Sequence, residues 1–550
     1  MVKRDLLIVI FFFFCISTYA ENIYLKQHNW GRRKTYYISK EYDLKGNTLI
    51  LPESATIKFR RKGKIVNGTI VGSNNVISSS LKPCFGQDVE FEGTFSCDMQ
   101  YEWLYESNCE IRDSSVTIYG KKYSVRVAIG SDQRNNITSA FKRVSRHFTG
   151  LHFNKSYVLE NPDGTVNTSN NILRIKDPLE NFTISGGIFY NAGFAIYHWH
   201  NIVVKDMTIY GRYHLYTDRD MNLDWTSFHS HNGEELCFAS VGVHLSNDAN
   251  SYIKNKGAII DNVAVYNCYN GIYVGTWLPS PDGQRTVEDV FVTNCSVHDM
   301  IYHGYSTCNC HNVIFDRNFA ENSYLGMLVD ISRGSSNVLF KNGIGKNLPQ
   351  PFKIALNTES LPTVNCTIDS CVVMVSSILH NCTLGPSVIL SGNGTCNITN
   401  NSITYNDNYG GTLLSLGATH DSKYVFKGNT IYSMPFYSFM RYTLYSDVSD
   451  VEVEFADNII YSDYFASTVY GIILDDLRQN ECDAALNILF NNNQFFFSAQ
   501  SSVQIPELQM LRRQGYNNFR INGKLYLSDN VIDYPPYNDL TVDLKQEISF

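Results

Sequence analysis

The chain has 550 residues, of which 43% are apolar and 18% are charged, and its formal net charge is −8. This composition excludes a disordered tail and a collagen-like fibre, and an acidic balance without a basic stripe argues against a nucleic-acid partner. The 36 Tyr, the 32 Phe and about one Asn in every ten residues predict many strands and turns rather than helices.

The first segment, residues 1–20, has the features of a secretory signal peptide. Lys3 and Arg4 precede an apolar run from Leu6 to Ile16, and small residues lead to Ala20. We therefore expect a secreted, periplasmic or cell-surface protein. After removal of this peptide no stretch reaches the roughly 18 apolar residues that span a membrane. A lipoprotein anchor through Cys15 is the less favoured alternative.

The cysteines do not suggest a disulfide framework. Without Cys15, 13 of the 14 cysteines remain, and obligatory pairing would be expected to use an even number. A chain of this length can also bury enough surface without covalent staples. Most of the cysteines are therefore expected to be buried as small apolar residues.

Residues 21–134 are predicted to form a β-rich N-terminal cap. Short strand patterns with turn signals occur at Thr48–Pro52 and Thr69–Gly72, and the stretch 84–134 is irregular. The segment 136–144 is the one clear candidate for a short amphipathic helix. No Pro-rich or Ser-rich linker follows, so the cap is expected to continue directly into the next part of the chain.

Residues 135–550 carry a repeat with a drifting period. A polar starter followed by an apolar triplet occurs at Asn201, Asn262, Asp289, Asn312 and Asn337, and the last four starters are 27, 23 and 25 positions apart. A second short strand follows each triplet, and no helical period is present. A unit of roughly 20–30 residues cannot bury its apolar face alone, so neighbouring units must stack. We therefore predict an all-β solenoid, a parallel β-helix.

Stacking of the units also suggests a structural role for the many Asn residues. Asn267 and Asn294 each follow their starters by five positions. In a β-helix they are expected to lie in adjacent coils about 4.8 Å apart, where their side chains can form an amide ladder.

The run from Asn136 to Gly187 resembles the entry to the right-handed parallel β-helix, or pectin-lyase-like, superfamily. The matching segments are Ser139-Ala-Phe-Lys-Arg-Val, Ser156-Tyr-Val-Leu and Ile184-Ser-Gly-Gly-Ile-Phe. Thr48 to Gly72 also resembles the start of secreted bacterial β-helix proteins. The resemblance implies a right-handed parallel β-helix of the carbohydrate-active type. It is specific for the fold and weak for the reaction.

Histidines gather where the repeat is interrupted. Nine of the 14 His lie between His198 and His311. In the same region 61 positions separate Asn201 from Asn262, instead of about 25, which predicts an insertion over residues 212–257. Polar loops on a rigid solenoid are a usual place for a functional site. A solvated polar loop with incidental histidines is the alternative.

Aligning the second strands gives a candidate catalytic group. With Ile196, Ile272, Ile301 and Met327 in one column, His303, Asp330 and Arg333 fall on adjacent coils within reach of one ligand. Histidine is a general acid or base near neutral pH, and aspartate can be an acid, a base or a nucleophile. Arginine can neutralise a substrate carboxylate. Turn residues satisfied by local hydrogen bonds are the alternative.

A sugar-binding surface is predicted from aromatic residues at strand positions that are expected to be exposed. Their rings offer flat apolar area with polar tips, although packing within a ladder would use the same residues. The candidate substrate-binding residues are Trp199, Tyr273, Trp277, Tyr302 and His244.

No cofactor is expected, and a divalent metal ion is the alternative. His198-Trp-His200 and His229-Ser-His231 each place two imidazoles on one side of a strand, a spacing that can hold a transition metal with a third ligand. A polar strand edge would show the same spacing.

Within the superfamily, the polygalacturonase-like glycoside hydrolases are matched only in part. Asn247-Asp248 and His303-Gly304 are similar to two of their motifs, but the Asp-Asp pair is missing from the expected coil. The acidic ligands and the basic residue of the calcium-dependent pectate lyases cannot be located either.

The predicted function is cleavage of glycosidic bonds in an extracellular polysaccharide or oligosaccharide. Hydrolysis, slightly favoured, needs two carboxylates, and the candidates are Asp248, Asp330 and Glu359. A lyase or epimerase acting on a uronate-containing glycan would use His303 or a tyrosine as base and Arg333 for the acidic sugar. A non-catalytic glycan-binding or adhesion solenoid is the third possibility. The sequence gives no sugar, linkage or oligomeric state.

Overall fold

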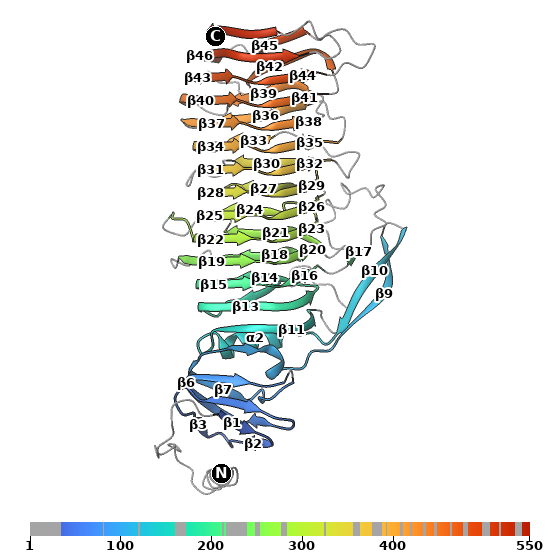
Figure 1. Ribbon diagram of the computed structural model, residues 1–550, viewed down its shortest axis with the longest axis vertical. Coiled ribbons are helices and arrows are strands. Elements are labelled where there is room, and N and C mark those ends of the chain that lie inside the picture. The colour runs from blue at the N-terminus through green and yellow to red at the C-terminus, as the bar shows by residue number, and fades with distance from the viewer. Residues whose placement is uncertain are drawn as a thin grey trace.

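The structure is a computed structural model that shows one long solenoid (Figure 1). It describes residues 35–80, 82–118, 121–159, 172–211, 214–215, 239–247, 254–276, 283–323, 326–355, 363–376, 388–391, 393–406, 411–418, 421–432, 436–444, 448–462, 465–476, 482–497, 507–515, 519–533 and 542–549. The predicted signal peptide, residues 1–20, lies outside these residues.

Parallel strands stack along the solenoid in three sheets, one strand of each sheet per regular coil. The first is the twelve-stranded sheet. Its strands are β12 (Ile172–Ile175), β14 (Gly193–Ile196), β18 (Ala239–Leu245), β21 (Cys268–Gly275), β24 (Tyr305–Cys308), β27 (Met327–Ile331), β30 (Gln350–Ala355), β33 (Val388–Ser391), β36 (Gly411–Ala418), β39 (Phe436–Leu444), β42 (Phe465–Asp476) and β45 (Glu507–Gly515).

The second sheet, called the β15 sheet here, runs from β13 (Leu179–Tyr190) to β46 (Phe519–Asp533), and each of these two strands pairs with one further strand at its end of the stack. Between them lie β15 (Trp199–Lys205), β19 (Asn255–Asp261), β22 (Val287–Thr293), β25 (Cys310–Asp316), β28 (Ser336–Lys341), β31 (Val364–Asp369), β34 (Asn393–Thr399), β37 (Ser422–Lys427), β40 (Val448–Ala456) and β43 (Cys482–Asn491).

The third sheet, the β16 sheet, follows the second after a short turn in each coil. It contains β16 (Thr208–Tyr210), β20 (Ala264–Tyr266), β23 (Ser296–Met300), β26 (Phe319–Ser323), β29 (Ile344–Leu348), β32 (Val372–Val375), β35 (Ser402–Tyr405), β38 (Thr430–Tyr432), β41 (Ile459–Ser462) and β44 (Gln494–Phe497). The long strands β13 and β46 pair with members of both sheets and so join them at the two ends. The parallel β-helix predicted from the repeat, and implied by the resemblance to the pectin-lyase-like superfamily, is confirmed.

Asparagine and aspartate make the bends between and within these strands. The repeat starters Asn201, Asp289, Asn312 and Asn337 all have φ between 51° and 56°, which is the left-handed region. Asn and Asp tolerate this region better than other residues with a Cβ, because their short polar side chains can hydrogen-bond locally. The Asn content therefore reflects a backbone requirement of every coil.

One starter was assigned to the wrong position. The strand pairing aligns Gly257, and not Asn262, with Asn201 on one side and Asp289 on the other. Gly257 has a φ of 73°, so glycine supplies the same left-handed conformation without a polar side chain. Asn262 also has a positive φ, but it follows the end of β19 at the next bend.

The predicted pairing of Asn267 with Asn294 is also wrong. The backbone N–H of Asn267 bonds to His298 O, whereas the Asn294 side chain bonds to Asp261, so the two residues lie at different corners of the coil. The predicted amide ladder does exist elsewhere. It consists of the buried Asn401, Asn429, Asn458, Asn493 and Asn530.

The N-terminal part is a smaller stack of mostly parallel strands below the solenoid (Figure 1). Its strands are β1 (Thr35–Ile38), β2 (Glu41–Asp43), β3 (Thr48–Ile50), β4 (Thr56–Phe59), β5 (Lys64–Val66), β6 (Gly68–Ser78) and β7 (Val89–Phe95). β8 (Asp98–Gln100), which precedes the short 3-10 helix η1 (Tyr101–Trp103), pairs in parallel with β11 (Gly150–Val158). The cap therefore continues into the first coil.

The predicted helix is present as α2 (Arg134–Val144). Ile137, Ala140, Phe141 and Val144 are buried, which is the i, i+3, i+4, i+7 spacing of one helix face. This face packs between the last strand of the cap and the first coils. The helix thus covers the end of the solenoid core.

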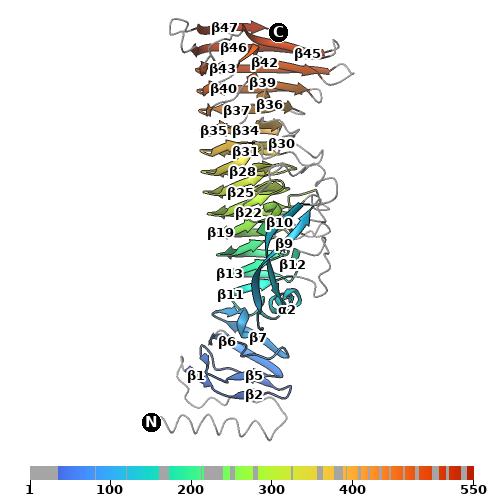
Figure 2. The same cartoon turned by 90° about the vertical axis from the view of Figure 1, so that its right-hand side faces the viewer.

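An antiparallel hairpin, β9 (Cys109–Ile118) and β10 (Lys121–Gly130), stands to the right of the solenoid in Figure 1 and in front of it in Figure 2. The two-residue strand β17 (His214–Leu215) pairs with β10. Residues 212–257 were predicted to be an insertion, yet β18 and the first residues of β19 belong to regular coils of the solenoid.

One apolar core runs through the molecule from Ile38 to Leu527. Ten cysteines between Cys84 and Cys396 are free, and eight of these ten are buried. Among the described residues, no helix is long and apolar enough to cross a membrane.

Candidate functional site

The outer face of the twelve-stranded sheet carries a line of polar residues across five successive coils. Strand pairing places His244, Tyr273, Ser306, Asp330 and Lys353 directly next to one another in that order. The residues on either side of them in each strand point into the core and are almost wholly buried. Because side chains alternate between the two faces of a strand, the five polar residues must share the outer face.

Asp330 is the centre of the group. Its Oδ2 lies 3.2 Å from His303 Nε2 and 3.4 Å from Lys353 Nζ. Asp330 and His303 are only 8% and 4% exposed, whereas the Lys353 side chain is 23% exposed. His303 stands just before β24, with its backbone N–H bonded to Asn270 Oδ1. Of the three side chains, that of Lys353 is therefore the one that faces solvent.

The hydrogen bonds fix the protonation of the histidine. A carboxylate is only an acceptor, so His303 Nε2 must carry the proton that it shares with Asp330. In the neutral imidazole, Nδ1 then has a free lone pair. Within the described structure, both His303 Nδ1 and Asp330 Oδ1 are buried and have no hydrogen-bond partner. These two atoms therefore have unused hydrogen-bonding capacity beneath the surface of the cluster.

The surrounding charges keep Asp330 ionised. Burial alone would raise the pKa of this carboxyl, but the attraction and hydrogen bonding of His303 and Lys353 outweigh burial and lower it. At neutral pH Asp330 is therefore a carboxylate that accepts two hydrogen bonds on one oxygen.

Tyr273, Cys308 and Arg333 adjoin the pair. The Tyr273 hydroxyl and the Cys308 thiol are hydrogen-bonded, and burial raises the pKa of both, that of Cys308 to about 12. The positive charge of Arg333 acts in the opposite direction on both groups, so the guanidinium lies near them. Arg333 follows β27 in a left-handed turn with a φ of 49°. Its carbonyl accepts hydrogen bonds from Asn309 N and Cys308 Sγ.

His244 begins the polar line. Its Nε2 donates to Gly275 O over 2.7 Å, and its ring meets the edge of Tyr273 with centroids 4.6 Å apart. Burial lowers the pKa of His244 to about 4. At neutral pH this imidazole is uncharged and supports Tyr273.

The predicted catalytic group is partly brought together. His303 and Asp330 are in direct contact, and Arg333 is close to the same cluster. Asp248, Glu359 and Trp277 lie outside the described residues. Lys353 and Cys308 were missed, although Lys353 follows Asp330 by 23 positions, the spacing that also separates Asp289 from Asn312. That spacing was the signal that could have found Lys353.

The predicted alignment of neighbouring strands in the twelve-stranded sheet differs from the observed strand pairing. It placed Asp330 beside Gly304, whereas the strands pair Asp330 with Ser306, and it placed Ile272 beside Ile301, whereas Ile272 pairs with Tyr305. In both cases the predicted partner is displaced from the observed partner by an even number of residues. Such a slip keeps every side chain on its own face, so the alternation of apolar residues cannot detect it.

The aromatic candidates are less exposed than predicted. Trp199 is 2% exposed and belongs to the core, and Tyr273 is 5% exposed. The expectation of exposed positions is therefore wrong for these two residues. Tyr302 is half-buried, and its ring is stacked on that of Tyr269 with centroids 5.5 Å apart. Its role in binding a sugar stays a prediction.

The proposed metal spacing does not hold for the first histidine pair. His198 has a φ of 52° and lies in a turn before β15, whereas His200 is exposed within the strand. The two are therefore not on one side of a strand. His229 and His231 lie outside the described residues. The described part of the chain contains no group of three or more His, Cys, Asp or Glu that could hold a metal ion.

No protein-family model matches the sequence, and no curated protein matches it. Many solved structures match in fold, and three of them follow. The catalytic unit of a thermostable GH87 alpha-1,3-glucanase from Streptomyces thermodiastaticus has 11% identity and a TM-score of 0.42, covering 71% of this chain and 67% of its own. The A-module of the Azotobacter vinelandii mannuronan C-5 epimerase AlgE6 has 12% identity and a TM-score of 0.39, covering 74% and 96%.

The third is a point mutant of the periplasmic alginate epimerase AlgG, with 11% identity and a TM-score of 0.37, covering 75% of this chain and 95% of its own. Similarities at this level do not indicate a reaction. The function must therefore be inferred from the residues of this chain.

Proposed function

We propose that the protein is a carbohydrate-active enzyme that modifies a uronate-containing polysaccharide by proton transfer, as a lyase or an epimerase. The observation that carries this proposal is the His303–Asp330 pair, in which Asp330 holds one nitrogen of the imidazole and the other is buried without a partner. The features of residues 1–20 support an extracellular, periplasmic or cell-surface location.

His303 Nδ1 is the base in this proposal. Asp330 fixes the tautomer and the direction of the ring, and it stabilises the imidazolium that forms when Nδ1 takes a proton. In a uronate this proton comes from the carbon next to the carboxylate. In the lyase reaction the glycosidic oxygen on the neighbouring carbon then leaves and takes up the proton from the His303 imidazolium, which gives an unsaturated sugar and a new chain end. In the epimerase reaction a water molecule instead donates a proton to the opposite face of the carbanion, and the imidazolium releases its proton to solvent.

Lys353 and Arg333 fit an acidic sugar. With Asp330 at −1 and the two cations at +1 each, the sum is +1 before His303 is counted. A substrate carboxylate is attracted to such a site, and neutralising it makes the neighbouring C–H more acidic. Lys353 forms the exposed edge, so it is the first of these groups to meet a glycan.

Hydrolysis is less well supported than proton transfer. A glycoside hydrolase needs two carboxyl groups, about 5–9.5 Å apart. In the described cluster of Tyr273, His303, Cys308, Asp330, Arg333 and Lys353, Asp330 is the one carboxylate. Asp248 or Glu359 would have to supply the second.

The test is incubation of the full chain with polygalacturonate, alginate and glucuronan and with neutral polysaccharides. Ultraviolet absorbance detects an unsaturated uronate, proton NMR in deuterated water detects inversion, and a reducing-end assay detects hydrolysis. His303→Gln and Asp330→Asn should each lower activity by at least about 10²-fold. His311→Gln is the matched control, because the His311 ring bonds to Ser336 in a different sheet, away from the cluster.

Two results would overturn the proposal. The first is full activity in His303→Gln with an unchanged melting temperature. The second is new reducing ends on a neutral glycan without unsaturated product, which would favour hydrolysis. Binding without turnover of any polymer would favour the adhesion alternative. The proposed step uses only side chains, so activity should survive a chelator.

A further inference from the structure

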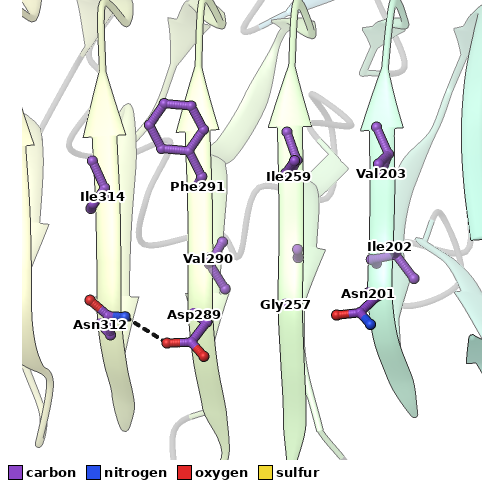
Figure 3. A pocket seen from close by; sticks show the side chains of 11 residues that line it. Asn201, Ile202, Val203, Gly257, Ile259, Asp289, Val290, Phe291, Asn312 and Ile314 are labelled. Carbon is purple, nitrogen blue, oxygen red and sulfur yellow. Dashed lines mark hydrogen bonds between the residues drawn. The ribbon is translucent and has the colours of Figure 1, made fainter. Parts of the chain in front are cut away.

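A hollow with a volume of about 360 Å³ lies on the outer face of the β15 sheet (Figure 3). It crosses four neighbouring strands, β15, β19, β22 and β25. It shares no residue with the cluster around Asp330, which lies on the twelve-stranded sheet. The proposed function therefore does not use this hollow.

The floor of the hollow is apolar. Val203, Ile259, Phe291 and Ile314 occupy matching positions on the four strands and point outward. Ile259 is 42% exposed, and the other three are half-buried. Because neighbouring strands are about 4.8 Å apart, these side chains form a flat apolar strip about 15 Å long.

A ladder of polar side chains runs along the strip and is broken at one rung. Asn201 donates its amide to Asn181 over 3.2 Å, and Asn312 donates to Asp289 over 2.6 Å. The position between Asn201 and Asp289 is Gly257, which has no side chain (Figure 3). A Cβ built on Gly257 would meet Asn201 Oδ1 as its nearest atom, so this oxygen faces the gap.

Both sides of the gap present hydrogen-bond acceptors. Asn201 donates one amide hydrogen to Asn181 and turns its Oδ1 toward the gap, and Asp289 is a carboxylate. The Asn312 hydrogen bond and Lys256 lower the pKa of Asp289, which keeps it charged. Lys256 Nζ lies 3.2 Å from Asp289 Oδ2, so these two charges balance each other. A molecule that fills the gap therefore meets acceptor oxygens on both sides and gains little from a charge of its own, which favours a neutral molecule with hydrogen-bond donors.

We propose that this hollow is a second, non-catalytic binding site for a neutral saccharide. A pyranose ring has an apolar C–H face, which suits Ile259 and the ring of Phe291, and hydroxyl donors around its edge, which suit Asn201 and Asp289. The two acceptor rungs are about 10 Å apart, so one short stretch of glycan can meet both. The site would hold a polymer on the side of the solenoid away from the proposed chemistry.

Gly257→Asn is the direct test, because it restores the missing rung. Asparagine adopts positive φ at many equivalent bends of this chain, so the backbone accepts it. The expected result is at least about tenfold weaker binding of neutral tetrasaccharides of glucose, mannose or galactose, measured by calorimetry. Gly428→Asn is the matched control. It fills a similar gap, 2.6 Å from Asn400 Oδ1, away from the hollow.

A second pair of variants keeps the test decisive if Gly257→Asn does not fold. Ile259→Ser removes an exposed part of the floor, and Val372→Ser removes an apolar side chain in the β16 sheet that is at least as exposed. Only Ile259→Ser should weaken binding. The proposal is overturned if none of the neutral tetrasaccharides binds the wild type, or if both hollow variants bind them as the wild type does. Loss of self-association in the hollow variants, seen by light scattering, would instead identify a second copy as the occupant.

Discussion

Asp330 receives two neighbours on the same oxygen, and each of them stabilises its charge. Lys353 contributes to the lowered pKa of this carboxyl, although its side chain is partly solvated. In Lys353→Met the pKa of Asp330 should rise, because burial then acts against a single favourable partner. The titration profile of the Asp330 carboxyl, followed by its carbon-13 NMR resonance, is expected to move to higher pH, and the KM for the acidic glycan should rise.

Lys346→Met is the control for this shift. Lys346 lies over the Phe319 ring in the β16 sheet and has no part in the cluster, so its removal should leave the profile unchanged. An unshifted titration profile of the Asp330 carboxyl in Lys353→Met would mean that Lys353 does not control its ionisation.

His244 should make stability depend on pH in a defined window. Its pKa is about 4 in the folded chain, below the usual 6.5, so the unfolded chain binds more protons between these values. The contribution of His244 is then fully present above pH 6.5 and is lost as the pH falls toward 4, by at most about 3 kcal/mol. Urea unfolding at pH 7 and pH 4.5 should show a smaller difference for His244→Gln than for the wild type. If the stability difference between pH 7 and pH 4.5 is the same in the wild type and in His244→Gln, the lowered pKa of His244 is contradicted.

At the scale of elements, the buried amide ladder ties the C-terminal coils together. The Asn458 side chain accepts two hydrogen bonds from Asn429 and donates to Phe426 O and Asn493 Oδ1. Asn458→Ala leaves these buried groups without partners, which is expected to cost roughly 2–4 kcal/mol in the free energy of unfolding. The urea midpoint measures this.

Asn397→Ala is the matched control, because Asn397 is only half-buried and has one side-chain bond, to Thr367. It should change the free energy of unfolding by well under half as much. If the two variants lose similar amounts of unfolding free energy, burial of the ladder is not the reason for its stabilising effect.

The strands and the helix were predictable where the spacing of apolar residues and the conformational preferences of single residues determine them. Alternating apolar residues with Asn and Asp bends suffice for a stack of short strands, and the face of α2 follows from its helical spacing. The pairing of individual strands was not predictable. Gly257 can replace an Asn at a left-handed bend, and an even slip leaves Asp330 on its correct face, so neither error violates the pattern.

At the scale of the whole molecule, a site assembles residues from several coils. His303 and Asp330 were predicted together, because any stacking of neighbouring coils brings them close. The positions of the β9–β10 hairpin and of β18 depend on contacts far apart in sequence, and no local period encodes them. The same limit applies to the hollow, which arises from one missing side chain in a ladder of four coils.

The far end of the stack gives a prediction for the whole molecule. β47 (Val542–Ser549) pairs antiparallel with β46 and so covers the edge that the last coil would otherwise expose. Deleting residues 534–550 should leave a long strand edge with unpaired N–H and C=O groups, which is a template for a second chain. Light scattering should then show dimers and larger aggregates. Adding Tyr526→Lys, at an outward position that is 39% exposed, should restore part of the monomer because a charged edge strand resists pairing. A truncated chain that stays monomeric without this lysine would mean that β47 does not protect the edge.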